Sequence, residues 1–155
     1  MINTRWHHDL PADEALVAHA AAYLGAGSIA VGRQCFWCGS VAHGAPWLRH
    51  AGRLVPVSLS RADGHLITVI AERPVGVDIE TIAAVAARWD PALVLAPGEV
   101  AHSAEEQALL WASKEAMLKA RGVGLTAPMS TVVMLGATIE RIDTPPGLVG
   151  VVALG

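Results

Sequence analysis

A strand that carries two acids restricts this chain more than any other feature. The segment GVDIE (76–80) is apolar except for Asp78 and Glu80. Side chains alternate along a strand, so these two carboxylates share one face while Val77 and Ile79 point into the core. Two carboxylates on one face repel each other unless a cation lies between them. The fold must therefore bring a positive group or a bound cation to this strand.

A helix predicted over residues 103–121 supplies a third acid. Ser103 and Glu106 form a capping-box pattern that predicts its start, and Gly122 and Gly124 lie just beyond its last turn. Helical periodicity places an apolar stripe on one side of it. That stripe consists of Leu109, Leu110, Ala116, Met117 and Ala120.

The only two lysines of the chain, Lys114 and Lys119, lie on this helix beside Glu115. Three carboxylates with ammonium groups next to them suit a divalent ion that carries a phosphate. Two simpler interpretations stay open. Glu115 and Lys119 could be an ordinary pair one turn apart on a solvated helix, and the strand acids could pair with Arg73 or Arg88.

Composition describes a globular protein of modest size. The chain has 155 residues, of which 53% are hydrophobic and 16% charged, enough for one domain or two half-domains that share a core. A net charge of −3 argues against a nucleic-acid partner. The uncharged stretch 15–32 is interpreted as a helix, a turn and a strand rather than a membrane span, and acids interrupt any secretory signal, so a cytoplasmic protein is expected.

The order of elements predicts an α+β fold. Helices are expected over 11–24 and 103–121, a structured loop over 35–52, and a loop from 89 to 98. Strands are expected over 28–33, 55–60, 66–71, 75–79, 131–135 and 147–154, the last two separated by 139–143 and a Pro145–Pro146 turn. The order of a helix followed by strands occurs twice, which indicates two similar halves packed face to face, the first of them shortened. The boundary is placed at Arg73–Pro74, giving half-domains 1–73 and 74–155, with a ligand expected between them.

Cys35 and Cys38 form a single C-x-x-C, followed by His43 and His50. The pattern is compatible with a zinc knuckle or with two reduced thiols on a tight loop. Trp37, in the same loop, is expected to fill the core or the seam between the halves.

Three segments together resemble the 4′-phosphopantetheinyl transferase superfamily, in its two-half form found with peptide and polyketide synthetases. They are VSLSRADG (57–64), GVDIE (76–80) and WASKEAMLKARGVGL (111–125). The segment CFWCGSVAHGAPWL (35–48) resembles the loop before the serine-containing strand in bacterial members. Their order and spacing also fit the family, over residues 35 to 130.

The resemblance implies two pseudo-symmetric α+β halves with coenzyme A in the cleft between them. It also implies a reaction, in which the phosphopantetheine arm moves from coenzyme A to a serine of an acyl or peptidyl carrier protein, releasing 3′,5′-ADP. Asp78, Glu80 and Glu115 fall on the family's magnesium-binding acids. Glu115 and Lys119 are the expected catalytic residues, with Glu115, or a water that it orients, as a possible proton acceptor.

The same resemblance assigns coenzyme A contacts. Lys119 and Lys114 fall on the lysines that meet the pyrophosphate, and Ser60 falls on the serine of a serine–histidine step at the nucleotide end. Here Arg61 replaces that histidine, and arginine can also bind phosphate. A monomer or a homodimer is expected.

Two further departures weaken the basic clamp around coenzyme A. Ala45, in Gly44–Ala45–Pro46, takes the place of a cation, and the 11–24 helix has no Lys or Arg. Arg33, Arg49 and Arg53 are available as replacements. Three functions stay open. They are a narrow-scope phosphopantetheinyl transferase, the same fold acting on another coenzyme A or carrier-bound substrate, and a non-catalytic module that binds a carrier or partner through Trp111, Leu118 and the Trp37/Trp47 loop.

Overall fold

The computed structural model describes residues 1–123, 127–134 and 136–155. Its elements, in chain order, are β1 (Ile2–His7), α1 (Ala12–Leu24), β2 (Ile29–Gln34), β3 (Ala45–His50), β4 (Arg53–Val55), β5 (Val57–Ala62), β6 (His65–Ala71), β7 (Val75–Thr81), α2 (Ile82–Ala87), α3 (Pro91–Val94), α4 (Ala104–Ala120), the 3-10 helix η2 (Met129–Thr131), β8 (Thr138–Arg141) and β9 (Leu148–Leu154). This combination of helices and antiparallel strands confirms the predicted α+β class.

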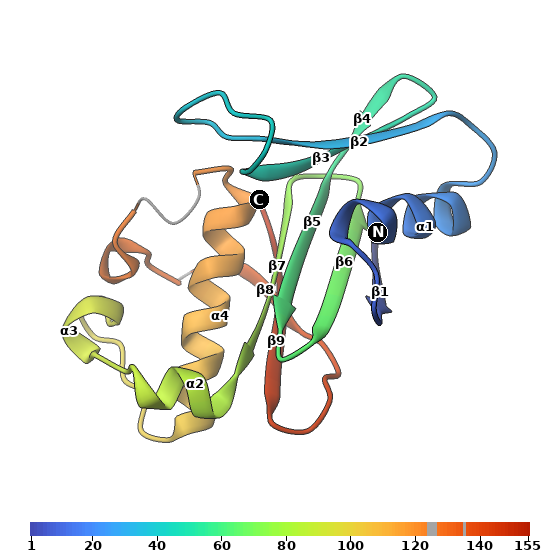
Figure 1. Cartoon of the computed structure of the whole chain (residues 1–155). Coiled ribbons are helices and arrows are strands. Elements are labelled where there is room, and N and C mark those ends of the chain that lie inside the picture. Colours follow the sequence, from blue (N-terminus) through green and yellow to red (C-terminus); the bar gives the residue numbers. More distant parts are fainter. Residues whose placement is uncertain (124–126, 135) are drawn as a thin grey trace.

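Three antiparallel sheets of three strands each make up the β structure, in the orders β1-β6-β5, β2-β3-β4 and β7-β9-β8. Figure 1 shows α4 beside β7 and β9, while α1 lies on the far side of the molecule near β1 and β6. The β2–β3 hairpin crosses one end of the molecule, above β5 (Figure 1). α4 thus packs against the β7-β9-β8 sheet, whereas α1 contacts both the β1-β6-β5 and the β2-β3-β4 sheets.

The first and last sheets meet at β5 and β7 through serine side chains. The Ser58 hydroxyl accepts a hydrogen bond from the Val77 N–H at 3.1 Å, and the Ser60 hydroxyl accepts one from the Ile79 N–H at 3.2 Å. These hydroxyls take the place that a neighbouring strand's carbonyls would fill in a ladder. Two N–H groups on the edge strand β7 therefore have hydrogen-bond partners on the edge strand β5, although the two strands do not form a continuous sheet.

The core crosses the predicted boundary between the halves. One buried cluster joins β6, β7 and β9, and its members are Ile67, Val69, Ala71, Val75, Val77, Ile79, Leu148 and Val152. A second cluster packs α4 onto the other face of β7 and β9. The turn at Arg73–Pro74 does separate β6 from β7 in sequence, but the two half-domains 1–73 and 74–155 stay a prediction.

The long helices follow the sequence signals closely. α1 ends at Leu24 before Gly25, and α4 begins after Ser103, whose hydroxyl accepts from the Glu106 N–H while Glu106 accepts from the Ser103 N–H. Gly124, the other predicted end signal, lies outside the described residues. The expected stripe was partly wrong: Leu118 is 1% exposed, whereas Leu109 and Leu110 are only half-buried.

Several element predictions were wrong, and each has a local reason. β1 was missed because its polar residues show no clear alternation, and β3 lies inside the stretch 35–52 that was predicted as a loop. In the predicted loop 89–98, Asp90 caps the short helix α3 by accepting from the Ala92 N–H. The predicted strand 131–135 fails because Thr131 ends η2, while Leu135 lies outside the described residues.

Candidate functional site

Three carboxylates converge between β7 and α4. Oxygens of Asp78, Glu80 and Glu115 all lie within 4.8 Å of one another. Asp78 is 2% exposed, and the other two side chains are half-buried. Val77 and Ile79 are buried on the opposite face of β7, which confirms the predicted alternation. The strand and the helix therefore bring together the acids that the sequence singled out.

Gly76 explains why α4 comes so close to β7. A Cβ atom at Gly76 would overlap the Ala116 carbonyl oxygen and lie 2.7 Å from the Ala120 nitrogen. Ala112, Ala116 and Ala120 are fully or almost fully buried on the same helix. Small residues on both elements allow the two backbones to approach, which places the Glu115 carboxylate within reach of the strand acids.

One oxygen of Asp78 is satisfied and the other is not. Asp78 Oδ1 accepts from Lys119 Nζ at 2.6 Å and from the Ser60 hydroxyl at 2.9 Å. Lys119 Nζ also donates to the Val77 carbonyl at 3.0 Å. Asp78 Oδ2 is buried and has no hydrogen-bond partner among the described residues. A buried carboxylate oxygen without a partner is costly, so a missing cationic partner would explain it.

The other two acids also have partners among the described residues. Glu80 Oε2 lies 3.1 Å from Arg88 Nη2, and Glu115 Oε1 accepts from the Trp111 indole N–H at 2.9 Å. The Arg88 guanidinium lies 4.8 Å from the centroid of the Trp111 ring. The alternative in which an arginine neutralises a strand acid is therefore realised for Glu80, by Arg88.

Burial raises the pKa of every acid in the cluster, and repulsion by a neighbouring acid adds to the rise for Glu80 and Glu115. Desolvation raises the pKa of Asp78, against the opposing effect of Lys119. Desolvation and the Asp78 charge raise the pKa of Glu80. Desolvation, Asp78 and Glu80 together raise the pKa of Glu115 to about 7, against Lys119 and the Trp111 hydrogen bond. Without a further cation, three neighbouring carboxylates are difficult to ionise together.

The donor set fits magnesium. Hard divalent cations take oxygen ligands, and magnesium in proteins is held by a few carboxylates together with waters and phosphate oxygens. Three acids outnumber the two cations at the cluster, Lys119 and Arg88, and one buried oxygen has no partner. Asp78, Glu80 and Glu115 are the residues that would hold the ion.

A cleft of about 780 Å³ adjoins this cluster through Lys119. The cleft lies between the β2–β3 hairpin, β5 and the end of α4, and its wall is largely apolar. Trp37 lines it and is 67% exposed, so the expectation that this side chain fills the core was wrong. Among the described lining residues, the cations are Arg33 and Lys119. The volume is in the range of sites that bind cofactors.

Ser60 and Arg61 face opposite ways, because successive residues of a strand do so. The Ser60 side chain is 6% exposed and binds Asp78, whereas Arg61 Nη2 donates to the Leu10 carbonyl at 3.3 Å on the other face of β5. Both were predicted to contact coenzyme A. The structure turns Ser60 inward as a partner of an acid and turns Arg61 away from it.

Lys114 is not part of the cluster. Its side chain is fully buried, and its ammonium donates to the Val94 carbonyl, the Glu99 carboxylate and the Met129 carbonyl. An ammonium has three hydrogens, so these bonds saturate it. The prediction that Lys114 binds pyrophosphate was therefore wrong: it ties α3 and η2 to α4.

Sequence reasoning missed several contributors to the site. Gly76 and Ser58 were given no role although both lie in the quoted segments, Arg33 was named only as an available cation, and Trp111 was assigned only to a possible carrier-binding surface. The i, i+4 spacing of Trp111 and Glu115 on one helix was the available signal for their hydrogen bond.

The fold and the cluster define a mixed α+β protein with oxygen ligands and a lysine suited to phosphate chemistry. Residues 74–147 match the family model of the 4′-phosphopantetheinyl transferase superfamily. The matched segment includes β7, α4, all three acids and Lys119. Residues 74–147 are thus similar to this superfamily, and the match supports phosphopantetheine transfer as the general activity. No curated protein shows significant similarity to the chain.

The helices were also compared with the requirements of a membrane span. In residues 1–123, 127–134 and 136–155, no helix combines the length and apolar character needed to cross a bilayer.

Proposed function

We propose that this protein transfers the 4′-phosphopantetheine group of coenzyme A to a serine of an acyl or peptidyl carrier protein, with magnesium. The serine oxygen forms a bond to the phosphorus that bears the pantetheine arm, and the bond from that phosphorus to the bridging oxygen breaks. The serine proton passes to a base, and 3′,5′-ADP leaves with the electron pair. The proposal places this reaction in the cytoplasm.

The observation that carries this proposal is the position of Lys119. Its ammonium lies 2.6 Å from Asp78 Oδ1, and the same residue lines the cleft. A diphosphate in the cleft beside Lys119 would therefore lie next to the acid cluster. Phosphoryl transfer depends mainly on positioning and on charge neutralisation, which this juxtaposition supports.

Each residue of the cluster has a role in the proposal. Asp78, Glu80 and Glu115 would hold magnesium, which supplies positive charge opposite the phosphate oxygens when bound. Lys119 offsets negative charge on the diphosphate and on the leaving phosphate. Glu115, or a water that it orients, would accept the serine proton. Ser60 and Trp111 hold Asp78 and Glu115 in place.

The cleft suits the rest of coenzyme A, but with few cations. Apolar and aromatic side chains form most of its wall, and Arg33 is the described cation besides Lys119. Arg49 donates to the Gly52 carbonyl, and Arg61 lies on the other face of β5, so neither replaces the missing clamp. Each lost charged contact to phosphate costs about 1.5–3 kcal/mol, so weak coenzyme A binding is expected.

A transfer assay tests the proposal. The protein is incubated with coenzyme A, magnesium and a panel of apo carrier proteins, and intact-mass spectrometry detects the modified serine. We expect transfer to at least one carrier, lost on chelation of magnesium and in Asp78→Asn. Glu140→Gln, which removes an exposed acid on β8, is the matched control and should retain transfer. Absence of transfer across a broad panel would contradict the proposal.

The large apolar cleft favours one alternative, a related reaction on another coenzyme A or carrier-bound substrate. A ligand other than coenzyme A that co-purifies with the protein would support it. A purely carrier-binding module is less well supported, because Leu118, one residue of its proposed surface, is buried, although Trp37 in that surface is exposed. Whether the protein is a monomer or a homodimer stays a prediction, which sedimentation would test.

A further inference from the structure

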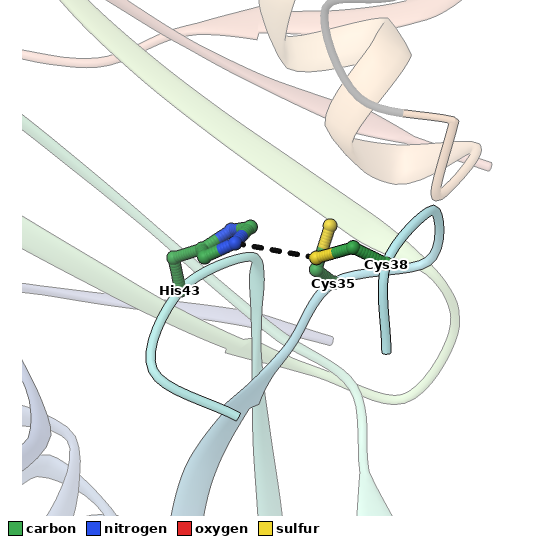
Figure 2. A group of neighbouring side chains, drawn as sticks. All are labelled: Cys35, Cys38 and His43. Carbon is green, nitrogen blue, oxygen red and sulfur yellow. Dashed lines mark hydrogen bonds between the residues drawn. The ribbon is translucent and has the colours of Figure 1, made fainter. Parts of the chain in front are cut away.

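A second cluster of metal-ligating side chains lies in the loop between β2 and β3, apart from the acids. Figure 2 shows Cys35, Cys38 and His43 gathered at this loop, with His43 turned toward the cysteines. Their two sulfurs and one ring nitrogen all lie within 4.8 Å of one another. Cys38 Sγ and His43 Nε2 are 3.4 Å apart. The spacing is short enough for one ion to bind all three.

The loop backbone builds this arrangement. The Cys35 N–H donates to the Ser40 carbonyl and the Gly39 N–H donates to the Cys35 carbonyl, both at 2.9 Å. Gly39 adopts φ +69°, a left-handed conformation that glycine reaches at little cost. These bonds fold residues 35–40 into a tight turn that puts both thiols on one side.

The hairpin then returns His43 to the thiols. Gln34 pairs with Ala45, so residues 35–44 must begin and end at adjacent points. Gly44, at φ +106°, passes so close to the Gln34 carbonyl that a Cβ atom there would overlap it. His50, the other candidate in the sequence, lies at the far end of β3 beside the Gly25 carbonyl. The fold therefore selects His43 from the two histidines.

We propose that Cys35, Cys38 and His43 bind a zinc-class divalent ion, with a fourth position open to water or a small ligand. Thiolate and imidazole are the ligands that zinc prefers, and two cysteines with two residues between them are the usual start of such a site. No fourth cysteine, histidine or acid joins this group within the described parts of the chain. Three protein ligands are typical of zinc sites that keep an open position.

The two clusters should bind different metals, because their ligand atoms differ. Soft sulfur ligands favour zinc, cobalt or copper, whereas three carboxylates favour magnesium or manganese. The thiol site would therefore fill independently of the acid site. Cys35, with its neighbours Phe36 and Trp37, also lines the cleft that ends at Lys119. An ion at this position would fix the conformation of that cleft wall.

Cobalt substitution tests this proposal directly. Reduced, metal-free protein is titrated with Co²⁺ in the presence of excess Mg²⁺, and absorbance spectra are recorded. We expect a single equivalent of Co²⁺ to give the thiolate charge-transfer band and the strong visible bands of a tetrahedral site. An equivalent of Zn²⁺ should abolish both, and purified protein should contain zinc by elemental analysis. Carboxylate-bound cobalt has no thiolate band, so the readout is independent of the transferase proposal.

Variants identify the ligands. Cys38→Ser and His43→Ala should each weaken Co²⁺ binding by at least ~10-fold, since even loss of a ligand's supporting partner costs that much. His102→Ala, which removes an exposed histidine elsewhere, should bind cobalt like the wild type. All three positions are exposed, so far-ultraviolet circular dichroism should stay unchanged.

Two results would overturn the proposal. The first is a reduced protein that shows no thiolate charge-transfer band with cobalt, or shows it unchanged in His43→Ala. The second is a Cys35–Cys38 disulfide that persists in a mild reductant under which a metal could still bind. Oxidised sulfurs cannot act as thiolate ligands.

Discussion

At the residue scale, Asp78 is the centre of the acid cluster. Two donors, Lys119 and Ser60, bind one of its oxygens, and the other oxygen is buried without a partner among the described residues. Glu115 lies on the other side of the cluster with a pKa of about 7. Both acids therefore carry negative charge that the described residues compensate only in part. The pKa of Glu115 is for this reason a sensitive measure of the electrostatics of the site.

Glu115→Gln should stabilise the metal-free protein at high pH. The pKa of Glu115 rises from 4.5 unfolded to about 7 folded, so its contribution to stability is present below 4.5 and is lost as pH rises through 7. Relative to wild type, the variant should be nearly equal in free energy of unfolding at about pH 4 and roughly 2 kcal/mol more stable at about pH 8. Urea unfolding with chelator measures both.

Magnesium provides the control for this prediction. Added Mg²⁺ should stabilise the wild type at high pH and stabilise Glu115→Gln much less, because binding to the folded state alone shifts the equilibrium. A variant that is no more stable than wild type at high pH would show that Glu115 carries no such repulsion.

The residue scale also shows what a sequence can predict about a site. The alternation rule predicted correctly that Asp78 and Glu80 share a face, because that rule depends only on strand geometry. It could not assign Ser60 and Arg61, because their directions depend on which face of β5 meets β7. Lys114 was misassigned since its partners, Glu99 and two backbone carbonyls, are distant in sequence.

At the element scale, the close contact between β7 and α4 holds the site together. Gly76→Ala would force these backbones apart, because the added Cβ atom meets backbone atoms of Ala116 and Ala120 that cannot move independently. Overpacking of this kind costs about 1–3 kcal/mol, and more where backbone must shift. We expect lower stability together with weaker Mg²⁺ binding, measured by urea unfolding and calorimetry.

Gly150→Ala is the matched control on β9. Its Cβ atom would meet only side-chain atoms of Ile142 and Thr144, which can rotate away. This variant should lose less stability and should bind Mg²⁺ as the wild type does. Equal Mg²⁺ affinity in Gly76→Ala would contradict the view that this contact positions the acids.

The β2–β3 hairpin supplies the second cation of the cleft. Arg33 lines the cleft and pairs with Asp13 at 3.1 Å, whereas Arg49, on the adjacent strand, binds only the Gly52 carbonyl among the described contacts. Arg33→Ala should weaken coenzyme A binding by about 1.5–3 kcal/mol, the range for a charged hydrogen bond. Calorimetry with Arg49→Ala as the matched control should show no such loss. Equal losses in both variants would remove Arg33 from the proposed site.

Elements with strong end signals were predicted well, and those fixed by distant partners were not. The capping box of α4 and Gly25 after α1 act within a few residues, so the sequence alone reveals them. β1 and β3 depend on pairing with β6 and β2, and short polar strands show no clear period by themselves. The convergence of Arg33 and Lys119 on one cleft likewise depends on tertiary packing.

At the scale of the whole molecule, the two predicted halves share one interior. β6 and β7 contribute to the same buried cluster on either side of Arg73–Pro74, and serine hydroxyls join β5 to β7. A fragment of residues 74–155 would expose Val77 and Ile79 to water and leave the Val77 and Ile79 amides unpaired. Burial of each large apolar side chain contributes roughly 1.5–3 kcal/mol.

We therefore expect the fragment 74–155 not to fold alone, although it contains the whole of the family match. Circular dichroism and urea unfolding should show no cooperative transition, and co-expression with residues 1–73 should restore it. A fragment that unfolds cooperatively at wild-type stability would show that the halves are independent domains.

The central claim is that the three acids hold a magnesium ion against a coenzyme A diphosphate beside Lys119. The most direct test is calorimetric titration of coenzyme A into the protein with Mg²⁺ and with chelator. We predict that Mg²⁺ tightens binding by at least ~10-fold, or about 1.4 kcal/mol, and that Asp78→Asn abolishes this difference. Coenzyme A affinity that is the same with and without Mg²⁺ would contradict the claim.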